Sequence, residues 1–186
     1  MNCIKKLFIT GEKRTGKSSL IKQIIRRSNI SAEGLFIQRI NVKNQDQIAY
    51  RLMDYSPSKD YCLEITCDKL SGYDNIFLIR AGNNIIYKNI NVFNDFGVRV
   101  LSSAVRRKPE LVLLDEIGSI EENAFLYRDA LFNALNSDIK LLGVLQKKSN
   151  SMIEAVKYHN DVCVHELTHS NMEEIEKIIL EYINNE

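Results

Sequence analysis

The apolar residues of the chain follow a strand pattern first and a helical pattern next. Residues 3–10, CIKKLFIT, form a short apolar run that ends at a glycine. In residues 18–28 the apolar side chains recur at the three- and four-residue spacing of one helix face, at Leu20, Ile21, Ile24 and Ile25. The pattern therefore predicts a strand, a glycine-containing loop and a helix, in that order.

From about residue 34 to residue 93 the pattern changes to short runs rich in β-branched and aromatic residues. Turn-forming stretches, SPSKD, SGYDN and AGNN, separate these runs, and Gly and Asn tolerate the positive φ angles of tight turns. We expect a β-rich insertion of consecutive antiparallel strands and hairpins. The expected strands are residues 35–42, 48–55, 61–67, 75–81 and 84–90.

The remaining residues alternate between helical spacing and continuous apolar runs. Continuous apolar runs are typical of strands buried in a parallel sheet, here residues 109–118, 138–146 and 161–167. Helical spacing occupies residues 93–108, 122–137, 151–159 and 170–183. This order predicts a three-layer α/β fold with a mostly parallel sheet that carries the antiparallel insertion.

Length and composition favour one ordinary globular domain over residues 1–186. The chain has 45% hydrophobic and 26% charged residues, two prolines and no low-complexity run, so no linker is visible. A formal net charge of +1 gives no electrostatic reason to expect nucleic acid or an anionic membrane as the main partner. Transmembrane-length apolar stretches are absent, and the apolar run near the N-terminus is too short for a signal peptide. The scattered cysteines are expected to be reduced thiols in a cytoplasmic protein: Cys3, Cys62, Cys67 and Cys163.

The stretch GEKRTGKS, residues 11–18, lies between the first predicted strand and helix, which is the context a phosphate-binding loop requires. Gly11 and Gly16 allow backbone N–H groups to point at phosphate oxygens, and the following helix adds its N-terminal dipole. Lys17 would reach the β- and γ-phosphates, and the Ser18 hydroxyl would ligate Mg²⁺. The other candidate nucleotide-binding residues of this segment are Glu12, Lys13, Arg14, Thr15 and Ser19.

A second acidic motif, LVLLDEIG, would complete such a site. Four apolar residues precede Asp115, as expected of a core strand next to the loop strand, and Asp115 would hold Mg²⁺. Glu116 follows directly and could deprotonate the attacking water as a general base. Gln146 ends the next buried strand, where it is either a γ-phosphate sensor or a plain strand-end residue. The following QKKS lacks the Asn and Asp of a guanine-reading motif.

These motifs together resemble the cancer-related nucleoside-triphosphatase family. The similar segments are GEKRTGKSSL, VLLDEIGSIE, LLGVLQ and ELTHSNMEEIEKII, and a looser similarity through the β-rich part extends it over nearly the whole chain. The resemblance implies a P-loop NTPase fold of the ATPase or RecA type. It also implies slow Mg²⁺-dependent hydrolysis of ATP and other nucleoside triphosphates to diphosphate and phosphate. The implied loop residues are Gly11, Gly16, Lys17 and Ser18, and the implied Walker B acids are Asp115 and Glu116.

The chain departs from the family pattern at two places. Lys13 and Arg14 replace the usual Pro-Gly, and their side chains either help neutralise a triphosphate or point to solvent. Asn171 matches the family's late asparagine and is a candidate nucleotide contact, but Met172 replaces the arginine that follows it. These departures affect the expected rate and base preference more than the expected fold.

The same motifs fit two other functions. A nucleoside or nucleotide kinase would share the loop and the metal, but kinases usually need an arginine-bearing lid, and the region after Gln146 is short. Glu116 beside Asp115 also favours water as the acceptor. A nucleotide-binding switch with little turnover would share the same motifs and differ only in rate.

The stretch HELTH, residues 165–169, matches the zinc-protease pattern H-E-x-x-H, which requires both histidines on one helix face. Here DVCV runs directly into His165, and Ser170 with Glu173 forms a capping-box pattern that would start the last helix. We therefore expect the histidines on a strand end and a loop, with Thr168 and Asn171 near the nucleotide.

Overall fold

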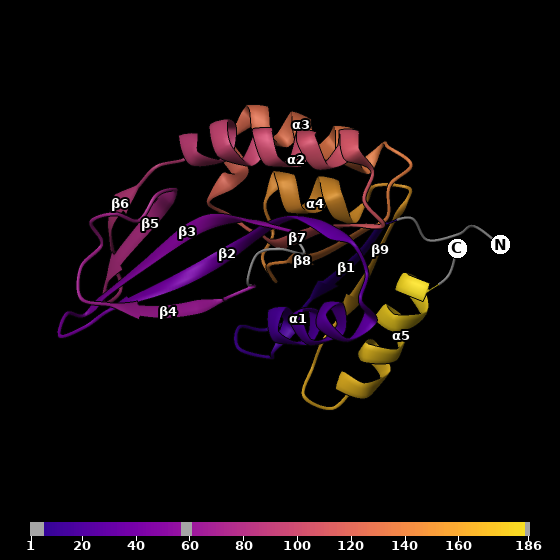
Figure 1. Ribbon diagram of the computed structural model, residues 1–186, viewed down its shortest axis with the longest axis horizontal. Helices are drawn as coiled ribbons and strands as arrows, with labels where there is room; N and C mark the ends of the chain where they lie inside the picture. The colour runs from indigo at the N-terminus through magenta and orange to yellow at the C-terminus, as the bar shows by residue number, and fades with distance from the viewer. Residues whose placement is uncertain (1–5, 57–60, 185–186) are drawn as a thin grey trace.

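The computed structural model describes residues 6–56 and 61–184, and helices and strands lie in the order that the sequence pattern predicts (Figure 1). Residues 1–5, including Cys3 and the start of the first predicted strand, and part of the predicted SPSKD turn lie outside the described residues. The elements are β1 (Lys6–Thr10), α1 (Lys17–Ser28), β2 (Ala32–Val42), β3 (Gln47–Tyr55), β4 (Glu64–Cys67), β5 (Ile76–Ala81), β6 (Asn84–Lys88), η1 (Phe93–Gly97), α2 (Val98–Arg107), β7 (Leu111–Ile117), η2 (Glu121–Asn123), α3 (Phe125–Leu135), β8 (Leu141–Leu145), α4 (Ser151–Lys157), β9 (Val162–Glu166) and α5 (Met172–Asn184).

One mixed sheet of nine strands organises the described residues. Its order is β6-β5-β3-β2-β7-β8-β1-β9, and β4 pairs with β2 off this path. The strands from β2 to β9 in this order are parallel, while β3, β5 and β6 extend the sheet in antiparallel fashion. All residues of β8 and six of the seven in β7 are buried, which explains their continuous apolar sequences.

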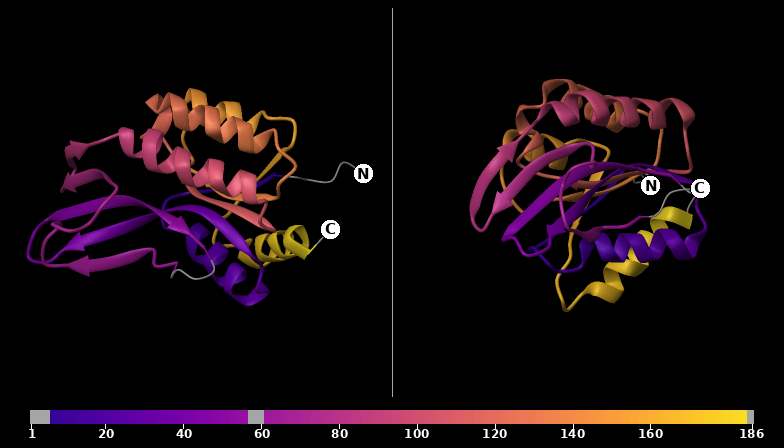
Figure 2. Two further views of the ribbon diagram at one scale, coloured as in Figure 1. Left: turned by 45° about the horizontal axis from the view of Figure 1, so that its top comes forward. Right: turned by 60° about the vertical axis from the view of Figure 1, so that its left-hand side comes forward.

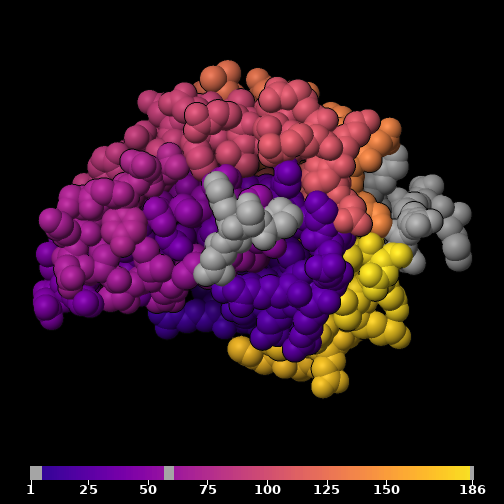
Figure 3. All heavy atoms as spheres, in the orientation of Figure 1, coloured from indigo at the N-terminus to yellow at the C-terminus, as the bar shows by residue number. Residues whose placement is uncertain are grey.

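Helices cover both faces of this sheet and give the predicted three layers (Figure 2). One hydrophobic core joins residues of α2, α3 and α4 to one face, and a second core joins α1 and α5 to the other. Figure 1 shows α2 to α4 above the sheet and α1 with α5 below it. The antiparallel strands project beyond the helices at one end of the molecule, opposite the yellow α5 in Figure 3.

The β-rich segment differs in one respect from the predicted run of antiparallel strands. The pairs β2–β3, β3–β5 and β5–β6 are antiparallel as expected, but β4 runs parallel to β2. The first half of β2 also pairs in parallel with β7, through Ala32–Phe36. At 11 residues β2 is long enough to pair with β7 along one half and with β4 along the other. It therefore belongs to the parallel core as well as to the β-rich segment.

The strand carrying Asp115 is not the direct neighbour of the loop strand, contrary to the expectation. β8 lies between β7 and β1 and pairs in parallel with both. The pattern of apolar residues shows that a strand is buried, but it does not show which strand lies beside it. The predicted neighbour of β1 was therefore wrong. The carboxyl ends of β1, β7 and β8 nevertheless meet at one edge of the sheet.

Candidate active site

The loop between β1 and α1 has a backbone that depends on glycine. Gly11 has φ 141° and Gly16 has φ 89°, both in the region that residues with a Cβ rarely adopt. A Cβ at Gly11 would also lie 2.3 Å from the Leu167 carbonyl oxygen, so the chain after β9 packs directly on the start of the loop. Arg14 has φ 66°, a left-handed conformation in the position where the resembled family has glycine. Arg14 thus adopts a backbone conformation that glycine favours, without being glycine.

Lys17 folds back over this loop. Its Nζ donates to the carbonyl oxygens of Gly11 and Glu12 at 2.9 and 2.7 Å, and only 8% of the residue is exposed. Thr15 Oγ1 donates to the same Glu12 carbonyl at 2.9 Å. Burial lowers the pKa of the Lys17 ammonium, and the carboxylates of Glu116 and Asp115 oppose this shift. The loop thus encloses one positive charge at the N-terminal end of α1.

Asp115 accepts hydrogen bonds on both carboxylate oxygens. Ser18 Oγ donates to Oδ1 at 2.7 Å, and the Tyr61 hydroxyl donates to Oδ2 at 2.5 Å. Burial raises the pKa of Asp115 to about 6, while the Tyr61 and Ser18 hydrogen bonds act in the opposite direction. A hydroxyl and a carboxylate at this separation are hard oxygen donors of the kind that Mg²⁺ prefers, so the residues present fit a magnesium site.

Glu116 lies beside Asp115 in a less buried position. Burial raises its pKa, and a hydrogen bond from Gln146 and the charges of Lys17, Lys13 and Lys148 lower it. Gln146 packs closely against Gly118, where a Cβ would lie 2.4 Å from the amide nitrogen. The structure therefore brings Gln146 to Glu116, and a role in sensing the γ-phosphate stays a prediction.

Glu121 is a buried acid that the sequence reasoning did not single out. It is 2% exposed, and its carboxylate accepts a hydrogen bond from the Gly118 backbone N–H. Asn150 Nδ2 donates to the Gly118 carbonyl at 3.2 Å, so the turn after β7 is held on both sides. Burial raises the pKa of Glu121 to about 7, partly opposed by backbone hydrogen bonds that include Gly118. The sequence feature that could have pointed to Glu121 is its position as the last residue of the DEIGSIE segment.

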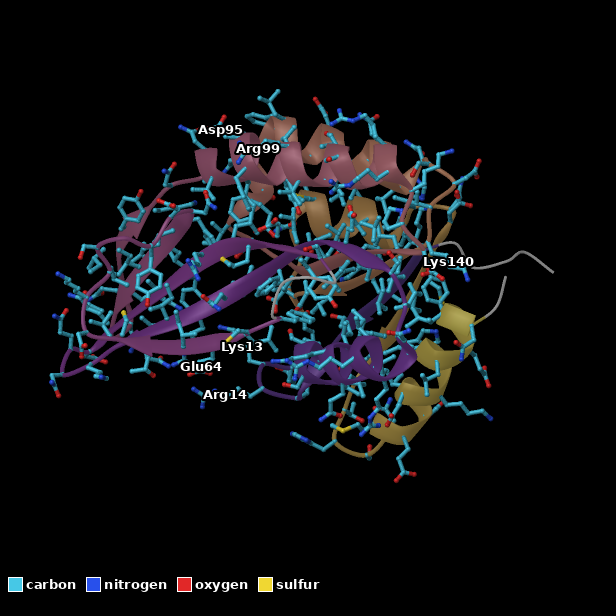
Figure 4. The ribbon with its side chains drawn as sticks, viewed as in Figure 1. Lys13, Arg14, Glu64, Asp95, Arg99 and Lys140 are labelled. Carbon is cyan, nitrogen blue, oxygen red and sulfur yellow. The ribbon has the colours of Figure 1, made fainter. Side chains whose placement is uncertain are left out.

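The other loop residues lie at the rim. Glu12, Lys13, Arg14 and Ser19 are exposed, and Figure 4 shows Lys13 and Arg14 on the loop before α1. Lys147, which follows Gln146, forms ion pairs with Glu12 at 3.0 Å and with Glu166 at 2.7 Å. These exposed pairs connect the loop to the ends of β8 and β9 and are worth little energy individually.

The HELTH stretch lies where the sequence analysis placed it. His165 is in β9 and His169 is in the turn before α5, so the two do not share a helix face. Asn171 Oδ1 accepts from the Thr168 backbone N–H at 2.7 Å and from Thr168 Oγ1 at 2.9 Å. Its Nδ2 donates to the Glu166 carbonyl at 2.9 Å. The amide of Asn171 therefore braces the turn that borders the loop.

The predicted start of the last helix is one residue early. Asn171, not Ser170, precedes the first residue of α5, and its carbonyl accepts the first helical hydrogen bond from Ile175. Ser170 Oγ instead contacts Thr168 Oγ1 at 3.0 Å. Met172, at the position of the family's arginine, lies beside the loop, with its Cε 3.7 Å from where a Gly16 Cβ would be.

The fold and the site can be compared with known proteins. Residues 6–180 match the family model described as NTPase. The chain is 27% identical to the nucleoside-triphosphatase THEP1 of Thermotoga petrophila over 175 residues, covering 94% of this chain and 90% of the relative. It is 26% identical to the nucleoside-triphosphatase THEP1 of Thermotoga maritima over 166 residues, covering 89% and 88% of the two chains.

Two solved structures share the fold. The crystal structure of THEP1 from Aquifex aeolicus superposes with a TM-score of 0.71 at 19% identity, covering 97% of this chain and 99% of the other. The solution structure of a human cancer-related nucleoside triphosphatase gives a TM-score of 0.60 at 17% identity, covering 97% of each chain. The predicted fold class, a mostly parallel three-layer P-loop NTPase sheet, is confirmed by this similarity.

Proposed function

The chain belongs to the NTPase family, and from this premise we propose that it is a Mg²⁺-dependent nucleoside-triphosphate phosphohydrolase that releases diphosphate and phosphate. Relatives that share about nine-tenths of their length with it are named nucleoside-triphosphatases, which supports the reaction class. The observation that carries the proposal is the convergence of Lys17, Ser18 and Asp115, with Ser18 Oγ 2.7 Å from the Asp115 carboxylate.

The triphosphate would bind in the loop of residues 11–19. Lys17 already donates two hydrogen bonds into this loop, to carbonyl oxygens that a phosphate can replace as acceptors. A phosphate oxygen carries more negative charge than a carbonyl, so the exchange is favourable for the ammonium group. Backbone N–H groups and the N-terminal end of α1 add further donors. Lys13 and Arg14 would contribute charge from the exposed rim, and Asn171 would shape the turn beside the loop.

Ser18 and Asp115 would hold the magnesium ion. When bound, Mg²⁺ neutralises charge on the β- and γ-phosphates and favours departure of the diphosphate. The Ser18 hydroxyl contributes a neutral oxygen ligand from the start of α1, and Asp115 contributes a carboxylate from the end of β7. The raised pKa of Asp115, about 6, still leaves the carboxylate largely ionised at neutral pH.

Glu116 would act as the general base. Burial raises the pKa of its carboxylate, which makes it a stronger proton acceptor than an exposed glutamate. It would take a proton from water while the water oxygen bonds to the γ-phosphorus and the bond to the diphosphate oxygen breaks. Gln146, hydrogen-bonded to Glu116, would orient the carboxylate and the water. Lys17 would stabilise the negative charge that moves onto the diphosphate.

The cytoplasmic location of the protein and the absence of membrane and nucleic-acid partners remain predictions. The described cysteines, Cys62, Cys67 and Cys163, are free thiols, which is consistent with a cytoplasmic location. In the described residues no helix has the length and apolar character to cross a membrane. A net charge of +1 gives no electrostatic reason to expect nucleic acid as a partner, which stays a prediction.

A phosphate-release assay with ATP, GTP, CTP and UTP, each with and without Mg²⁺, tests the proposal. We expect phosphate and diphosphate in equal amounts from more than one triphosphate, with release lost when EDTA removes the metal. Transfer of label from γ-labelled ATP to a nucleoside or nucleotide acceptor would show a kinase instead. Tight nucleotide binding without release of phosphate would show a switch.

A further inference from the structure

The hydroxyl of Tyr61 approaches the proposed metal ligand from the β-rich half of the molecule. It donates to Asp115 Oδ2 at 2.5 Å, a contact between residues 54 positions apart in the sequence. Tyr61 lies in the connection between β3 and β4, outside the motifs that define the site. Only 2% of the residue is exposed, so its hydroxyl faces the carboxylate in a buried environment. A hydrogen bond to a charged group in such an environment contributes more than one in water.

Packing fixes the ring of Tyr61 in this place. The ring contacts Phe36 edge-on with 4.8 Å between ring centroids, and it contacts Tyr55 at 5.2 Å. Phe36 is on β2 at the position paired with Asp115 of β7, so the Tyr61 ring packs on a residue that is the sheet neighbour of Asp115. Aromatic pairs of this kind add to the energy of burial and restrict the ring. The phenol is therefore held at one angle to Asp115.

The backbone after Tyr61 is anchored as well. Gln38 Nε2 donates to the Cys62 carbonyl at 2.5 Å, and the Arg39 backbone N–H donates to the Leu63 carbonyl at 2.9 Å. Arg51 Nε in turn donates to Gln38 Oε1 at 2.8 Å. These contacts tie the segment to β2 and β3. The position of the Tyr61 hydroxyl is thus set by the β-rich segment and not by the phosphate loop.

We propose that Tyr61 is a positioning residue that fixes the Asp115 carboxylate for divalent-cation binding. The inference rests on the proposed function. Ser18 and Tyr61 hold opposite oxygens of the carboxylate, which prevents rotation of the group about its terminal torsion. The Ser18 oxygen can bind a cation through a lone pair while its O–H still donates to Oδ1, and Tyr61 is the described donor that holds the other oxygen, Oδ2. Loss of the phenol oxygen would leave a buried carboxylate oxygen without that partner.

Tyr61→Phe tests the proposal because it removes the hydroxyl and keeps the ring. Tyr55→Phe is the matched control: it makes the same chemical change in the neighbouring ring, which contacts Tyr61 but not the described oxygens of Asp115. Mn²⁺ serves as a paramagnetic probe, and its binding is measured by electron paramagnetic resonance in the presence of ADP. We expect the dissociation constant for Mn²⁺ to rise about tenfold in Tyr61→Phe and to stay unchanged in Tyr55→Phe.

A kinetic measurement tests the proposed hydrolysis separately from the role of Tyr61. In the phosphate-release assay, Tyr61→Phe should need about tenfold more Mg²⁺ for half-maximal rate, with a smaller change in the rate at saturating Mg²⁺. Wild-type protein without Mg²⁺-dependent release of phosphate would refute the proposed function. The Mn²⁺ titration would still test the role of Tyr61 in that case. An unchanged Mn²⁺ affinity in Tyr61→Phe, or an equal loss in Tyr55→Phe, would overturn the inference about Tyr61.

A second variant keeps the test decisive if Tyr61→Phe does not fold. Phe36→Leu removes the edge-on contact that orients the Tyr61 ring but retains the hydroxyl. It should weaken Mn²⁺ binding in the same direction as Tyr61→Phe and by a smaller factor. Folding of each variant is checked by thermal unfolding without ligand. Folded Phe36→Leu protein with wild-type Mn²⁺ affinity would contradict the positioning role.

Discussion

At the scale of single residues, the site is unusual in its buried acids. Asp115 and Glu121 are 3% and 2% exposed, and burial raises the pKa of each well above its ordinary value. Burying a carboxylate costs free energy, and strongly shifted acids cluster at functional sites. Glu121 contacts the Gly118 N–H, so its place is explained by the turn that follows Glu116.

The pH dependence of stability tests the burial of Glu121. Its pKa rises from 4.5 to about 7, so the native state keeps a proton that the unfolded state loses. The resulting stability is fully present below pH 4.5 and is lost as the pH rises through about 7. Glu121→Gln cannot titrate, so between pH 5 and pH 8 its free energy of unfolding should gain up to about 3 kcal/mol relative to wild type.

Denaturant unfolding across this pH range measures the difference. Asp115 has a pKa shift of the same sign, from 3.8 to about 6, but its contribution is common to both proteins and cancels. The readout is the pH dependence and not the absolute stability of the variant. The glutamine introduces an NH2 donor, and the described partner of this side chain, the Gly118 N–H, is itself a donor. Parallel curves for the two proteins would show that Glu121 is ionised throughout in the folded chain.

Site residues could be predicted from sequence where one local motif carries the chemistry. Gly11, Lys17 and Ser18 follow from a strand, a loop and a helix in succession, and the acids follow from an apolar run that ends at Asp115. Tyr61 could not be found this way, because its hydrogen bond to Asp115 depends on β2 and β7 pairing across the sheet. No local pattern around Tyr61 records that pairing.

At the scale of elements, the junction of β9 and α5 is the boundary of the loop. Leu167 follows β9 and its carbonyl lies against Gly11, while Met172 opens α5 beside Gly16. The Asn171 amide holds the turn between them through three hydrogen bonds. The sequence placed this junction to within one residue: its S-x-x-E pattern makes Ser170 the residue before the helix, whereas Asn171 holds that place.

Replacement of Asn171 by alanine tests whether this turn is structural. The change removes three hydrogen bonds and should lower the free energy of unfolding by about 1–2 kcal/mol in the absence of nucleotide. Ser170→Ala in the same turn removes one contact between partly exposed hydroxyls and is the matched control, expected within about 0.5 kcal/mol of wild type. Unchanged stability of Asn171→Ala, combined with weaker nucleotide binding, would favour direct contact with the nucleotide.

At the scale of the whole molecule, the sheet brings distant segments to one edge. The elements were predictable from their periods, but the strand order was not: β8 separates β7 from β1, and β4 runs parallel to β2. Partner choice depends on helix packing over both faces, which hydrophobic pattern alone does not encode. The ends of β1, β7 and β8 meet all the same, and a bound nucleotide would contact several elements together.

Ligand stabilisation follows from that arrangement. A non-hydrolysable ATP analogue with Mg²⁺, at about 100 times its dissociation constant, should add about 2.7 kcal/mol to the free energy of unfolding. For a chain of this size that corresponds to a rise of roughly 5–10 °C in Tm. Lys17→Ala should lose most of the rise, whereas Lys177→Ala, on the exposed face of α5, should keep it.

Differential scanning calorimetry of the three proteins, each with and without the analogue, provides this comparison. The unliganded Tm of Lys17→Ala shows separately how much the bonds to Gly11 and Glu12 contribute to the loop. An equal rise in wild type and Lys17→Ala would mean that the analogue binds elsewhere on the molecule.

We propose that Glu116 activates water for attack on the γ-phosphate, and Glu116→Gln removes the basic carboxylate while keeping the size of the side chain. Phosphate release at saturating Mg²⁺ and ATP is compared with the dissociation constant of a fluorescent ATP analogue in the same variant, with Glu181→Gln on exposed α5 as control. We expect kcat to fall by about 100-fold or more while the dissociation constant of the analogue stays within about threefold of wild type. Retention of wild-type kcat by Glu116→Gln would contradict it.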